Sequence, residues 1–534
     1  RAIETIGTIN TIATDKTGTL TENKLSVQDT WQLPGSRDNL PQAVALSAND
    51  FEVTHDPLDL ALDRFVKVKN TTLAENEPIK TFTFDQKLPI SGNLWYYGSK
   101  YRLSLKGNPE VLIEQCRLSE NDRETCQQAL NQLTAEGYRV LALAEVILNV
   151  KETSLGTIWS KHHPKFVGLI GVKDTLRPEA KKAIAQAKRA GVTVRMITGD
   201  HFETAFQIGK QLGLLARRDQ VFDCQQMDML EESNLQTVVR DALAFSRVTP
   251  EDKLKILSIL KDSQVVAMTG DGVNDVPALV GAHVGIAMGS GATIAKDAGD
   301  IILLDDNFSN IVEAMKEGRI IVSNIRRMLY YLLATNAGEA ITAIGALFLK
   351  STMIFTPVQI LWVNFVTDSF LVFPLGLEPA ENQTMRRKPD DPSAPILSKT
   401  LIVRMVLVAT SLAALALGVY TYYLGRYGHA GASTLAFAAL IVAQWSNAVN
   451  ARSFFQSVLV RLRTPNVSFY ICMAVAIGLQ LLVFFGPLGS ILHIASVPLA
   501  SLAIVCAIAF VAPIILVELH KLIAYYLKRN RRTR

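Results

Sequence analysis

The stretch Thr14–Asn23, TDKTGTLTEN, places one carboxylate, that of Asp15, at the end of an apolar run and follows it with Lys, Gly and Thr residues. Two similar stretches occur later. VTVRMITGD ends at Asp200, and SQVVAMTGDGVND ends at Asp275. In each case a short apolar segment of strand composition ends in a polar turn, and a helical pattern follows. Strands that alternate with helices predict a doubly wound parallel sheet, in which ligands bind beyond the carboxyl ends of the strands.

Composition divides the chain into two parts. Its 534 residues have a mean hydropathy of +0.21. Charges occur throughout the chain as far as Glu317, whereas long apolar runs dominate from Ile320 onward. The five cysteines are scattered and form no CxxC pair, which favours reduced thiols in a cytosolic soluble part. Because the chain starts at Arg1 without a Met or a signal peptide, we expect it to be a fragment of a longer protein.

Six apolar runs are long enough to cross a bilayer, which takes about 20 apolar residues. Basic residues flank the first run, the second-to-third and fourth-to-fifth connections and the tail, while the alternate connections are nearly neutral. This pattern places both chain ends in the cytoplasm and explains the net charge of +5 without a nucleic-acid partner. The predicted spans are Met328–Leu349, Pro357–Leu377, Leu401–Leu424, Ser433–Val449, Ser468–Leu488 and Ser496–Val517.

Asp15 is the candidate nucleophile, because a carboxylate can attack a phosphoryl group and form an aspartyl phosphate. Asp271 and Asp275 are spaced to share a Mg²⁺ with Asp15, since this ion takes a few carboxylates together with phosphate oxygens. Lys253, in RVTPEDK, is the candidate cation that neutralises the transferring oxygens. The glycines in GDG are expected to let the backbone come close to the ion.

The TGD stretch, Thr198, Gly199 and Asp200, supplies candidate hydrogen-bond donors to the same phosphoryl group. Taken alone, each of these stretches has an ordinary explanation. GD and DG pairs usually mark turns, and a Lys on a helix is usually a solvated charge. Four stretches in one chain, each at a predicted strand end, favour the catalytic interpretation.

Together, DKTGTLT and MTGDGVNDVPAL resemble the motifs of the P-type cation-transporting ATPases, and the similarity runs from Arg1 to the last predicted span. KGNPE, GYRVLALA and DTLRPEA are similar to further motifs of this family. The resemblance implies an α/β, HAD-like phosphorylation domain with an inserted α+β nucleotide-binding domain, followed by a six-helix transmembrane bundle. The implied boundaries are 1–26 and 165–318 for the phosphorylation domain, 27–164 for the insert and 319–534 for the membrane domain.

The resemblance makes Asp15 the phosphate acceptor, with Lys16 and Thr17 shaping its surroundings. In soluble phosphatases of the same fold, the second residue after the nucleophile is an Asp that acts as acid and base. Thr17 carries no carboxylate, so water is not readily activated and the phosphoenzyme is expected to persist. The implied Mg²⁺ ligands are Asp15, Thr17, Asp271 and Asp275.

The same resemblance implies that the insert binds ATP, with the ring of Phe84 stacked on adenine. Asp59 stands where the family has a Glu, and KGNPE carries Asn108 where the family has Ala. DTLR also replaces DPPR, and the stretch after Phe84 is shorter than usual. These departures are expected to affect ATP affinity more than reaction type. The implied nucleotide contacts are Asp59, Phe84, Lys106, Arg139, Arg177 and Asn274.

Polar side chains within spans are costly and usually functional. Glu339 and Asp368 have no evident Lys or Arg partner in the spans, and their carboxylates could join amide oxygens in a hard-oxygen site. Interhelical hydrogen bonding is the alternative, and it explains Gln444, Asn447 and Asn450 well. ATNAGEA and PVQILWVNFVTD resemble the fifth and sixth membrane helices of calcium pumps. The implied cation ligands are Asn336, Glu339, Asn364, Thr367, Asp368 and Gln444.

Calcium pumps of the sarcoplasmic-reticulum type carry a Glu where Gln444 stands, and plasma-membrane types carry Gln, so we expect one Ca²⁺ per cycle. The resemblance also implies an actuator domain with a TGE loop and four earlier spans in the rest of the protein. The expected partners are therefore ATP, the transported cation, the lipid bilayer and this missing N-terminal part. Without that part, we expect the chain to bind nucleotide and accept phosphate but not to complete transport.

Three alternatives to Ca²⁺ export from the cytoplasm remain open. A pump for Mn²⁺ or for monovalent cations belongs to the same class. A membrane-anchored HAD-type phosphohydrolase belongs to another, and Thr17 together with the acidic residues in the spans argues against it. The last is a non-catalytic scaffold with a decayed fold, which the intact Asp15 and Lys253 argue against.

Overall fold

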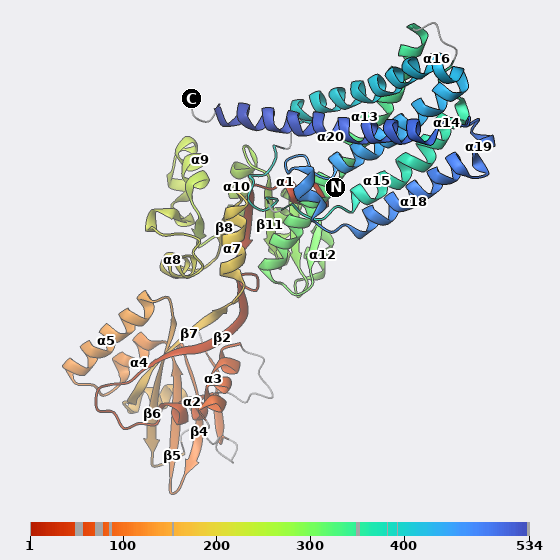
Figure 1. Cartoon of the computed structure of the whole chain (residues 1–534). Helices are drawn as coiled ribbons and strands as arrows, with labels where there is room; N and C mark the ends of the chain where they lie inside the picture. The colour runs from red at the N-terminus through yellow and green to blue at the C-terminus, as the bar shows by residue number, and fades with distance from the viewer. Residues whose placement is uncertain are drawn as a thin grey trace. The chain divides into compact units, whose positions relative to one another are not determined.

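The structure is a computed structural model of the chain. It describes residues 2–48, 57–69, 78–84, 88–151, 154–348, 353–381, 383–391 and 394–530. These residues form two compact units. One is essentially Ile9–Glu313, and the other consists mainly of Ile3–Thr8 with Ala314–Arg534 (Figure 1). The boundary at residue 314 coincides with the change in composition seen in the sequence.

The first unit contains a seven-stranded parallel sheet in the order β13-β12-β11-β1-β8-β10-β9. Its central strand β1, Thr11–Asp15, pairs with β11, Val266–Gly270, on one side and with β8, Thr193–Ile197, on the other. All described pairings in this sheet are parallel, which confirms the predicted parallel α/β sheet. The outer strands are β9 (Val221–Asp223), β10 (Ala244–Ser246), β12 (Val284–Met288) and β13 (Ile301–Leu303).

The inner strands of this sheet are apolar along their length because both faces are covered. β11 and β12 are buried at every residue, and β1 is buried up to Thr14. Continuous rather than alternating burial is typical of parallel strands between two helical layers. The helices between these strands are α7 (Ala180–Arg189), α8 (Phe202–Gln211), α9 (Glu232–Asp241), α10 (Pro250–Lys261), α11 (Val276–Gly281) and α12 (Thr293–Ala298).

The same unit contains a six-stranded antiparallel sheet in the order β2-β7-β6-β5-β4-β3. Its first strand begins at Thr21 and its last ends at Leu176, so the sheet extends beyond the predicted insert 27–164 at both ends. Its role in binding nucleotide stays a prediction. The strands are β2 (Thr21–Trp31), β3 (Lys80–Phe82), β4 (Ile90–Tyr97), β5 (Lys100–Gly107), β6 (Arg139–Leu148) and β7 (Lys165–Leu176).

Two separate apolar clusters cover the faces of this antiparallel sheet. One joins Leu103 and Leu105 of β5 to α4, Pro109–Gln115, and to α5, Glu120–Ala135. The other joins β6 and β7 to α2, Leu40–Ser47, and α3, Pro57–Val68. Because side chains alternate along a strand, Lys106 lies on the face opposite to Leu105, which is the face of α2 and α3.

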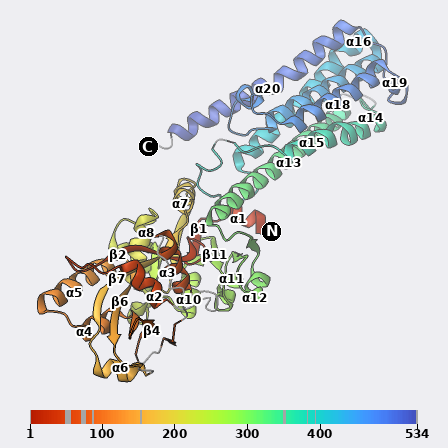
Figure 2. The same ribbon diagram turned by 90° about the horizontal axis from the view of Figure 1, so that it is seen from below.

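The second unit contains five helices, among the described residues, that are long and apolar enough to cross a membrane. The protein is therefore a multi-pass membrane protein. In the two views, α15 lies beside α18, and α16 lies beside α20 (Figure 2). The five stretches are α13 (Phe308–Phe348), the run Pro357–Gly376, α16 (Lys399–Ala451), α18 (Val467–Phe485) and Leu499–Leu527 of α20 (Leu499–Asn530).

The predicted third and fourth spans both lie in α16, which is 53 residues long. A straight helix of that length would measure about 80 Å, more than twice the thickness of the hydrocarbon core. Gly428 interrupts it with φ 65° and ψ −174°, a conformation that favours glycine. Arg404 Nη1, near the start of α16, donates to the carbonyl of Phe454 beyond its end at 3.1 Å. The element is thus a hairpin, and the prediction of six membrane crossings stays a prediction.

The predicted second span is not a uniform α-helix. It begins as α14, Pro357–Trp362, continues as a π-helical segment over Val363–Asp368 and ends as α15, Ser369–Gly376. Thr356 caps its N-terminus by accepting from the N–H of Gln359 at 3.3 Å. Segments of π-helix are frequent at functional sites, and this one contains three of the predicted cation ligands.

Candidate functional site

Asp15 is fixed at the carboxyl end of β1 by its backbone. Its N–H donates to Thr269 Oγ1 at 2.9 Å, and the Thr269 hydroxyl donates to Thr14 Oγ1 at 3.3 Å. The N–H of Thr17 lies 3.4 Å from Asp15 Oδ1. The role of Thr269 was missed from sequence. Its only signal is its position two residues before Asp271 in MTGDG.

Lys253 bridges two of the predicted carboxylates. Its Nζ lies 2.8 Å from Asp15 Oδ2 and 2.7 Å from Asp275 Oδ1. The residue occupies the first turn of α10, which begins with a reciprocal cap between Thr249 and Asp252. Burial disfavours its charged form, but the two carboxylates outweigh burial and raise the pKa of Lys253 above its usual value. The ammonium therefore stays charged between Asp15 and Asp275.

The turn after β11 wraps its backbone around the carboxylate of Asp275. Oδ2 of Asp275 accepts the N–H of Asp271 at 3.1 Å and that of Gly272 at 3.2 Å. A Cβ at Gly270 would lie 2.5 Å from the Cβ of Asp275, so the approach of this side chain requires glycine there. We predicted that Gly270 lets the backbone approach an ion, but its close neighbour is the side chain of Asp275.

Asp271 completes a group of mutually repelling carboxylates. Burial, and then the charges of Asp15 and Asp275, raise the pKa of Asp271 above its usual value, while Lys253 acts in the opposite direction. In the described part of the chain, no three His, Cys, Asp or Glu side chains form a ready metal cage. Mg²⁺ needs only one or two carboxylates when waters and phosphate oxygens supply the rest. The donors therefore fit a Mg²⁺ that would bind together with phosphate and would be held by Asp15 and Asp271. Thr17 and Asp275 stay predicted ligands, although both carboxylate oxygens of Asp275 already accept hydrogen bonds from Lys253, Asp271 and Gly272.

The Asp271→Asn variant is expected to be more stable than the wild type in Mg²⁺-free buffer. The folded-state pKa of Asp271 is raised, so its ionised form destabilises the fold at neutral pH, and this cost disappears as the pH falls through that pKa. A neutral amide removes the repulsion. The gain is expected to be about 1 kcal/mol, or ~2–4 °C in the unfolding midpoint of a domain of this size.

Thermal unfolding of the full chain, with and without Mg²⁺, measures this effect. In the presence of inorganic phosphate, Mg²⁺ is expected to stabilise the wild type and to have little effect on Asp271→Asn. Asp228→Asn is the matched control, because the Asp228 side chain is 98% exposed. An unfolding midpoint for Asp271→Asn below that of the wild type in Mg²⁺-free buffer would show that repulsion among these carboxylates does not destabilise the fold.

The TGD stretch follows β8 and is tied to the residue after Asp15. Asp200 Oδ2 pairs with Lys16 Nζ at 2.8 Å, and the Asp200 N–H donates to Thr198 Oγ1 at 3.1 Å. The Thr198 hydroxyl accepts that bond through a lone pair and keeps its own proton for donation. A Cβ at Gly199 would meet nothing within 4 Å, so space alone does not require glycine there.

Four of the predicted nucleotide contacts gather at one end of the antiparallel sheet. The register places three strand termini at the same end of this sheet. They are the end of β3, two residues before Phe84, the end of β5, which contains Lys106, and the start of β6 at Arg139. Lys106 pairs with Asp59 of α3, and both side chains are more than nine-tenths buried. Phe84 is 64% exposed, so its ring has a face open for stacking.

The other two predicted nucleotide contacts lie elsewhere. Arg177 Nη2 donates to the carbonyl of Gly18 at 3.0 Å, and its Nε donates to that of Thr21 at 3.2 Å. It thereby holds the loop that follows the candidate nucleophile. Asn274 is exposed and precedes Asp275 in the turn after β11. The structure therefore places both at the parallel sheet, apart from Phe84.

In the second unit, two amides hold the carboxylate of Glu339 on α13. Gln444 Nε2 donates to its Oε1 at 2.8 Å, and Asn364 Nδ2 donates to its Oε2 at 3.4 Å. Gln444 is fully buried, and its Oε1 has no hydrogen-bond partner within the described part of the chain. A buried carbonyl oxygen without a partner, beside a carboxylate, is suited to coordinating an oxygen-ligated cation.

Asp368 is bound by the same face of α13. Tyr331 Oη donates to its Oδ1 at 3.0 Å, and Thr335 Oγ1 lies 3.5 Å from its Oδ2. Tyr331, Thr335 and Glu339 are four residues apart, so they share one helix face. Sequence reasoning missed the two hydroxyls, although this spacing from Glu339 was available as a signal.

The structure does not bring Asn336 to this face of α13. The Asn336 side chain is exposed, and its Nδ2 donates to the carbonyl of Leu332 in its own helix at 2.8 Å. Thr367, by contrast, is only 2% exposed beside Asp368. The cluster thus consists of Glu339, Asn364, Thr367, Asp368 and Gln444, with Tyr331 and Thr335 as partners.

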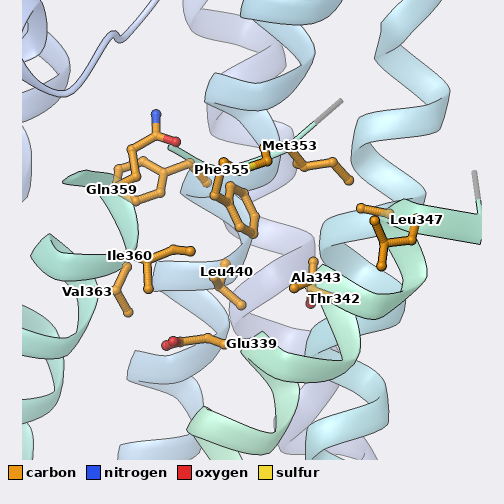
Figure 3. A pocket seen from close by; sticks show the side chains of 13 residues that line it. Glu339, Thr342, Ala343, Leu347, Met353, Phe355, Gln359, Ile360, Val363 and Leu440 are labelled. Carbon is orange, nitrogen blue, oxygen red and sulfur yellow. The ribbon is translucent and has the colours of Figure 1, made fainter. Parts of the chain in front are cut away.

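A cavity of about 120 Å³ lies beside Glu339, between α13, α14, α16 and residues 353–355. Figure 3 shows Glu339 at one end of the cavity and Phe355 and Gln359 toward the other. The amide of Gln359 is already engaged, because its Nε2 donates to the carbonyl of Leu492 at 2.9 Å. Glu339 is the single charged residue in this lining, so the cavity leads to its carboxylate between apolar walls.

Comparisons with known proteins match both the unit that contains the parallel sheet and the unit of apolar helices. Residues 9–283, about half of the chain, match the family model of haloacid dehalogenase-like hydrolases. Residues 352–523 match the model of the C-terminus of cation transporting ATPases. The chain belongs to the P-type cation-transporting ATPases. Its HAD-like sheet with Asp15 and its apolar helices are therefore the two parts of one P-type ATPase chain.

Several curated relatives resemble this P-type ATPase over most of its length. A calcium-transporting ATPase of Bacillus subtilis is 32% identical over 92% of the chain and 61% of the relative. Calcium-transporting ATPase 1 of Lactococcus lactis is 34% identical over 90% of the chain and 58% of the relative. A sodium/potassium exporting P-type ATPase of Schizosaccharomyces pombe is 35% identical over 73% of the chain and 40% of the relative. The chain spans at most about three fifths of the length of these relatives.

Proposed function

We propose that the protein containing this chain uses ATP to export Ca²⁺ from the cytoplasm through an aspartyl phosphate on Asp15. The observation that carries the proposal is the cluster around the partly buried Glu339, whose carboxylate meets the amides of Asn364 and Gln444, with the Gln444 amide oxygen left unpaired among the described residues. Buried oxygen donors without a Lys or Arg partner suit a hard cation such as Ca²⁺. Two calcium-transporting relatives support this choice of ion.

In the proposed reaction, a carboxylate oxygen of Asp15 attacks the γ-phosphorus of ATP. The bond from this phosphorus to the bridging oxygen breaks, and ADP leaves. Lys253, 2.8 Å from Asp15, neutralises charge that develops on the transferring oxygens, and the Thr198 hydroxyl donates to one of them. Mg²⁺, when bound, neutralises further phosphate charge. Because Thr17 offers no carboxylate, no side chain at that position primes water, and the aspartyl phosphate persists.

ATP is proposed to bind at the end of the antiparallel sheet where the strand termini bring Phe84, Lys106 and Arg139 together. The exposed ring of Phe84 would stack on adenine. Lys106, paired with Asp59 in this structure, and Arg139 would line the pocket. Arg177 and Asn274 would act from the parallel sheet, where they lie near Asp15 and Asp275, as the nucleotide's phosphates arrive.

The proposed cation ligands are Glu339, Asn364, Thr367, Asp368 and Gln444, and Asn336 is left out because its exposed side chain donates to its own helix. Gln444 is neutral, which leaves two carboxylates and favours one Ca²⁺ per cycle. Six membrane crossings with both chain ends in the cytoplasm are also proposed, with the α16 hairpin contributing two. An actuator domain and four earlier helices are proposed to come from the rest of the protein.

Monovalent transport is the second candidate, because one relative at 35% identity is a sodium/potassium exporting ATPase. Steady-state ATP hydrolysis by the full-length protein in lipid nanodiscs distinguishes the ions. We expect Ca²⁺ to stimulate hydrolysis by about tenfold over the cation-free rate, a usual size for coupling between two sites. Mn²⁺, Na⁺ and K⁺ are assayed in parallel at fixed free Mg²⁺.

Stimulation by Na⁺ or K⁺ alone would assign monovalent transport, and stimulation by Mn²⁺ alone would assign Mn²⁺. Hydrolysis that responds to none of these cations would overturn the proposal of a pump and favour a membrane-anchored phosphohydrolase. Equilibrium binding of radioactive Ca²⁺ counts the ions. One ion per phosphorylation site is expected, and two would contradict the role given to Gln444.

A further inference from the structure

The connection between α16 and α18 carries an apolar surface that faces away from the protein. It contains the short helix α17, Val458–Leu462. Val458 and Arg461 are buried against the unit, at 5% and 2% exposure. On the outward side, Leu459 is 76% and Val460 is 53% exposed. An outward helix face in water is normally polar, so this apolar face is typical of a segment at a membrane interface.

Basic side chains accompany this apolar surface. Arg463 follows α17 and is exposed, as are Arg386 and Lys388 in the connection between α15 and α16. Within the described residues, no ion pair is recorded for any of these three cations. Residues 452–468 contain no acidic residue at all. This connection is therefore apolar and positively charged along its own sequence, and the neighbouring carboxylates are Asp390 and Asp391 after Lys388 and Glu518 at the start of α17.

The two connections are locked to each other, so the surface is preformed. Glu378 pairs with Arg452 at 3.0 Å and with Arg461 at 2.9 Å, and all three side chains are at most 3% exposed. The guanidinium of Arg387 stacks 3.6 Å from the ring centroid of Phe455, which is itself 62% exposed. Buried ion pairs with good geometry hold the segments that carry the exposed cations and the apolar side chains.

We propose that this surface, called here the α17 surface, binds an anionic phospholipid. The guanidinium and ammonium groups are suited to the lipid phosphate, because charge-assisted hydrogen bonds to phosphate are strong. The outward apolar side chains are suited to the upper part of the acyl chains. The connection runs from the end of α16 to the start of α18. Because both are membrane-spanning helices, the connection between them lies at the level of the lipid headgroups. The α17 surface consists of Arg386, Arg387, Lys388, Phe455, Leu459, Val460, Arg463 and Val467.

The proposal is tested on the full chain in phosphatidylcholine nanodiscs that contain spin-labelled phosphatidylglycerol or spin-labelled phosphatidylcholine. Electron paramagnetic resonance measures the fraction of each lipid that the protein immobilises. We expect preferential immobilisation of phosphatidylglycerol, weakened by added salt. Each cation near the lipid contributes roughly fivefold in affinity, so the triple variant Arg386→Gln, Lys388→Gln, Arg463→Gln is expected to lose most of this preference.

Arg426→Gln is the matched control. Arg426 is also an exposed arginine, on α16 itself, two residues before the interruption at Gly428, and its guanidinium lies 5.7 Å from the ring centroid of Tyr422. It is expected to keep the full preference for phosphatidylglycerol. Equal immobilisation of both lipids by the wild type would overturn the proposal, as would an equal loss in the triple variant and in Arg426→Gln.

A second measurement does not depend on charge removal. A phosphatidylglycerol with a photoreactive acyl chain is expected to crosslink to residues 455–467, and the Leu459→Ser variant is expected to give a lower crosslinking yield. Crosslinks spread evenly over all membrane helices would contradict a site. Neither measurement involves ATP or a transported cation, so this proposal stands or fails independently of the proposed function.

Discussion

The Asp15→Asn variant of the full-length protein is expected to lose all acid-stable, hydroxylamine-labile phosphate transferred from ATP. An amide nitrogen cannot replace the carboxylate oxygen that attacks phosphorus, and no other carboxylate occupies the end of β1. The loss is expected to exceed about 10³-fold, as for other enzymes that lack their nucleophile. Labelling with radioactive ATP, acid quenching and hydroxylamine treatment measure it directly.

Two controls separate this loss from misfolding. Asp228→Asn changes an Asp whose side chain is 98% exposed in the same unit, and it should label like the wild type. Asp15→Asn itself should still bind a fluorescent nucleotide, because Phe84 and Lys106 lie on a different sheet. Undiminished labelling of Asp15→Asn would remove Asp15 as the acceptor and with it the proposed mechanism.

The Glu339→Gln variant is expected to weaken Ca²⁺ binding by at least about 100-fold. The substitution removes one of two carboxylates in the cluster, whereas even groups that only support a metal ligand are worth roughly 10–100-fold in affinity. It also presents an amide to Gln444 and Asn364, which both donate to the carboxylate in the wild type. Equilibrium binding of radioactive Ca²⁺ in nanodiscs gives the affinity.

Glu518→Gln is the matched control, because Glu518 is also a carboxylate on an apolar helix but its charge is balanced by Lys521 at 2.9 Å. It is expected to retain Ca²⁺ affinity. Phosphorylation of Glu339→Gln by ATP should then require far more Ca²⁺ than the wild type does. Wild-type Ca²⁺ affinity in Glu339→Gln would place the transported ion elsewhere.

Local sequence determined much of the fold and supplied the candidate reacting groups. The apolar run before Asp15 and the GDG turn after β11 identified strand ends of a parallel sheet, because continuous apolar strands and glycine turns are local properties. Long apolar runs likewise marked the membrane unit, since a span is defined by its own length and composition. The motifs that contain Asp15 and Asp271 also indicated the family.

Tertiary structure alone decided which side chains meet. Lys253 and Asp15 are 238 residues apart, and no local pattern links them. The same holds for the contacts of Thr269 with Asp15 and of Lys16 with Asp200. Such contacts depend on strand order, which the chain acquires only when distant segments pack together.

In the membrane unit, packing decided which face of α13 carries the cluster. Spacing suggested Asn336 as a neighbour of Glu339, but the structure turns Thr335 toward Asp368 and leaves Asn336 exposed. The reversal at Gly428 and the π-helical segment also depend on neighbouring helices. An isolated helical pattern fixes which residues share a face, whereas only the packed partner determines which face is buried.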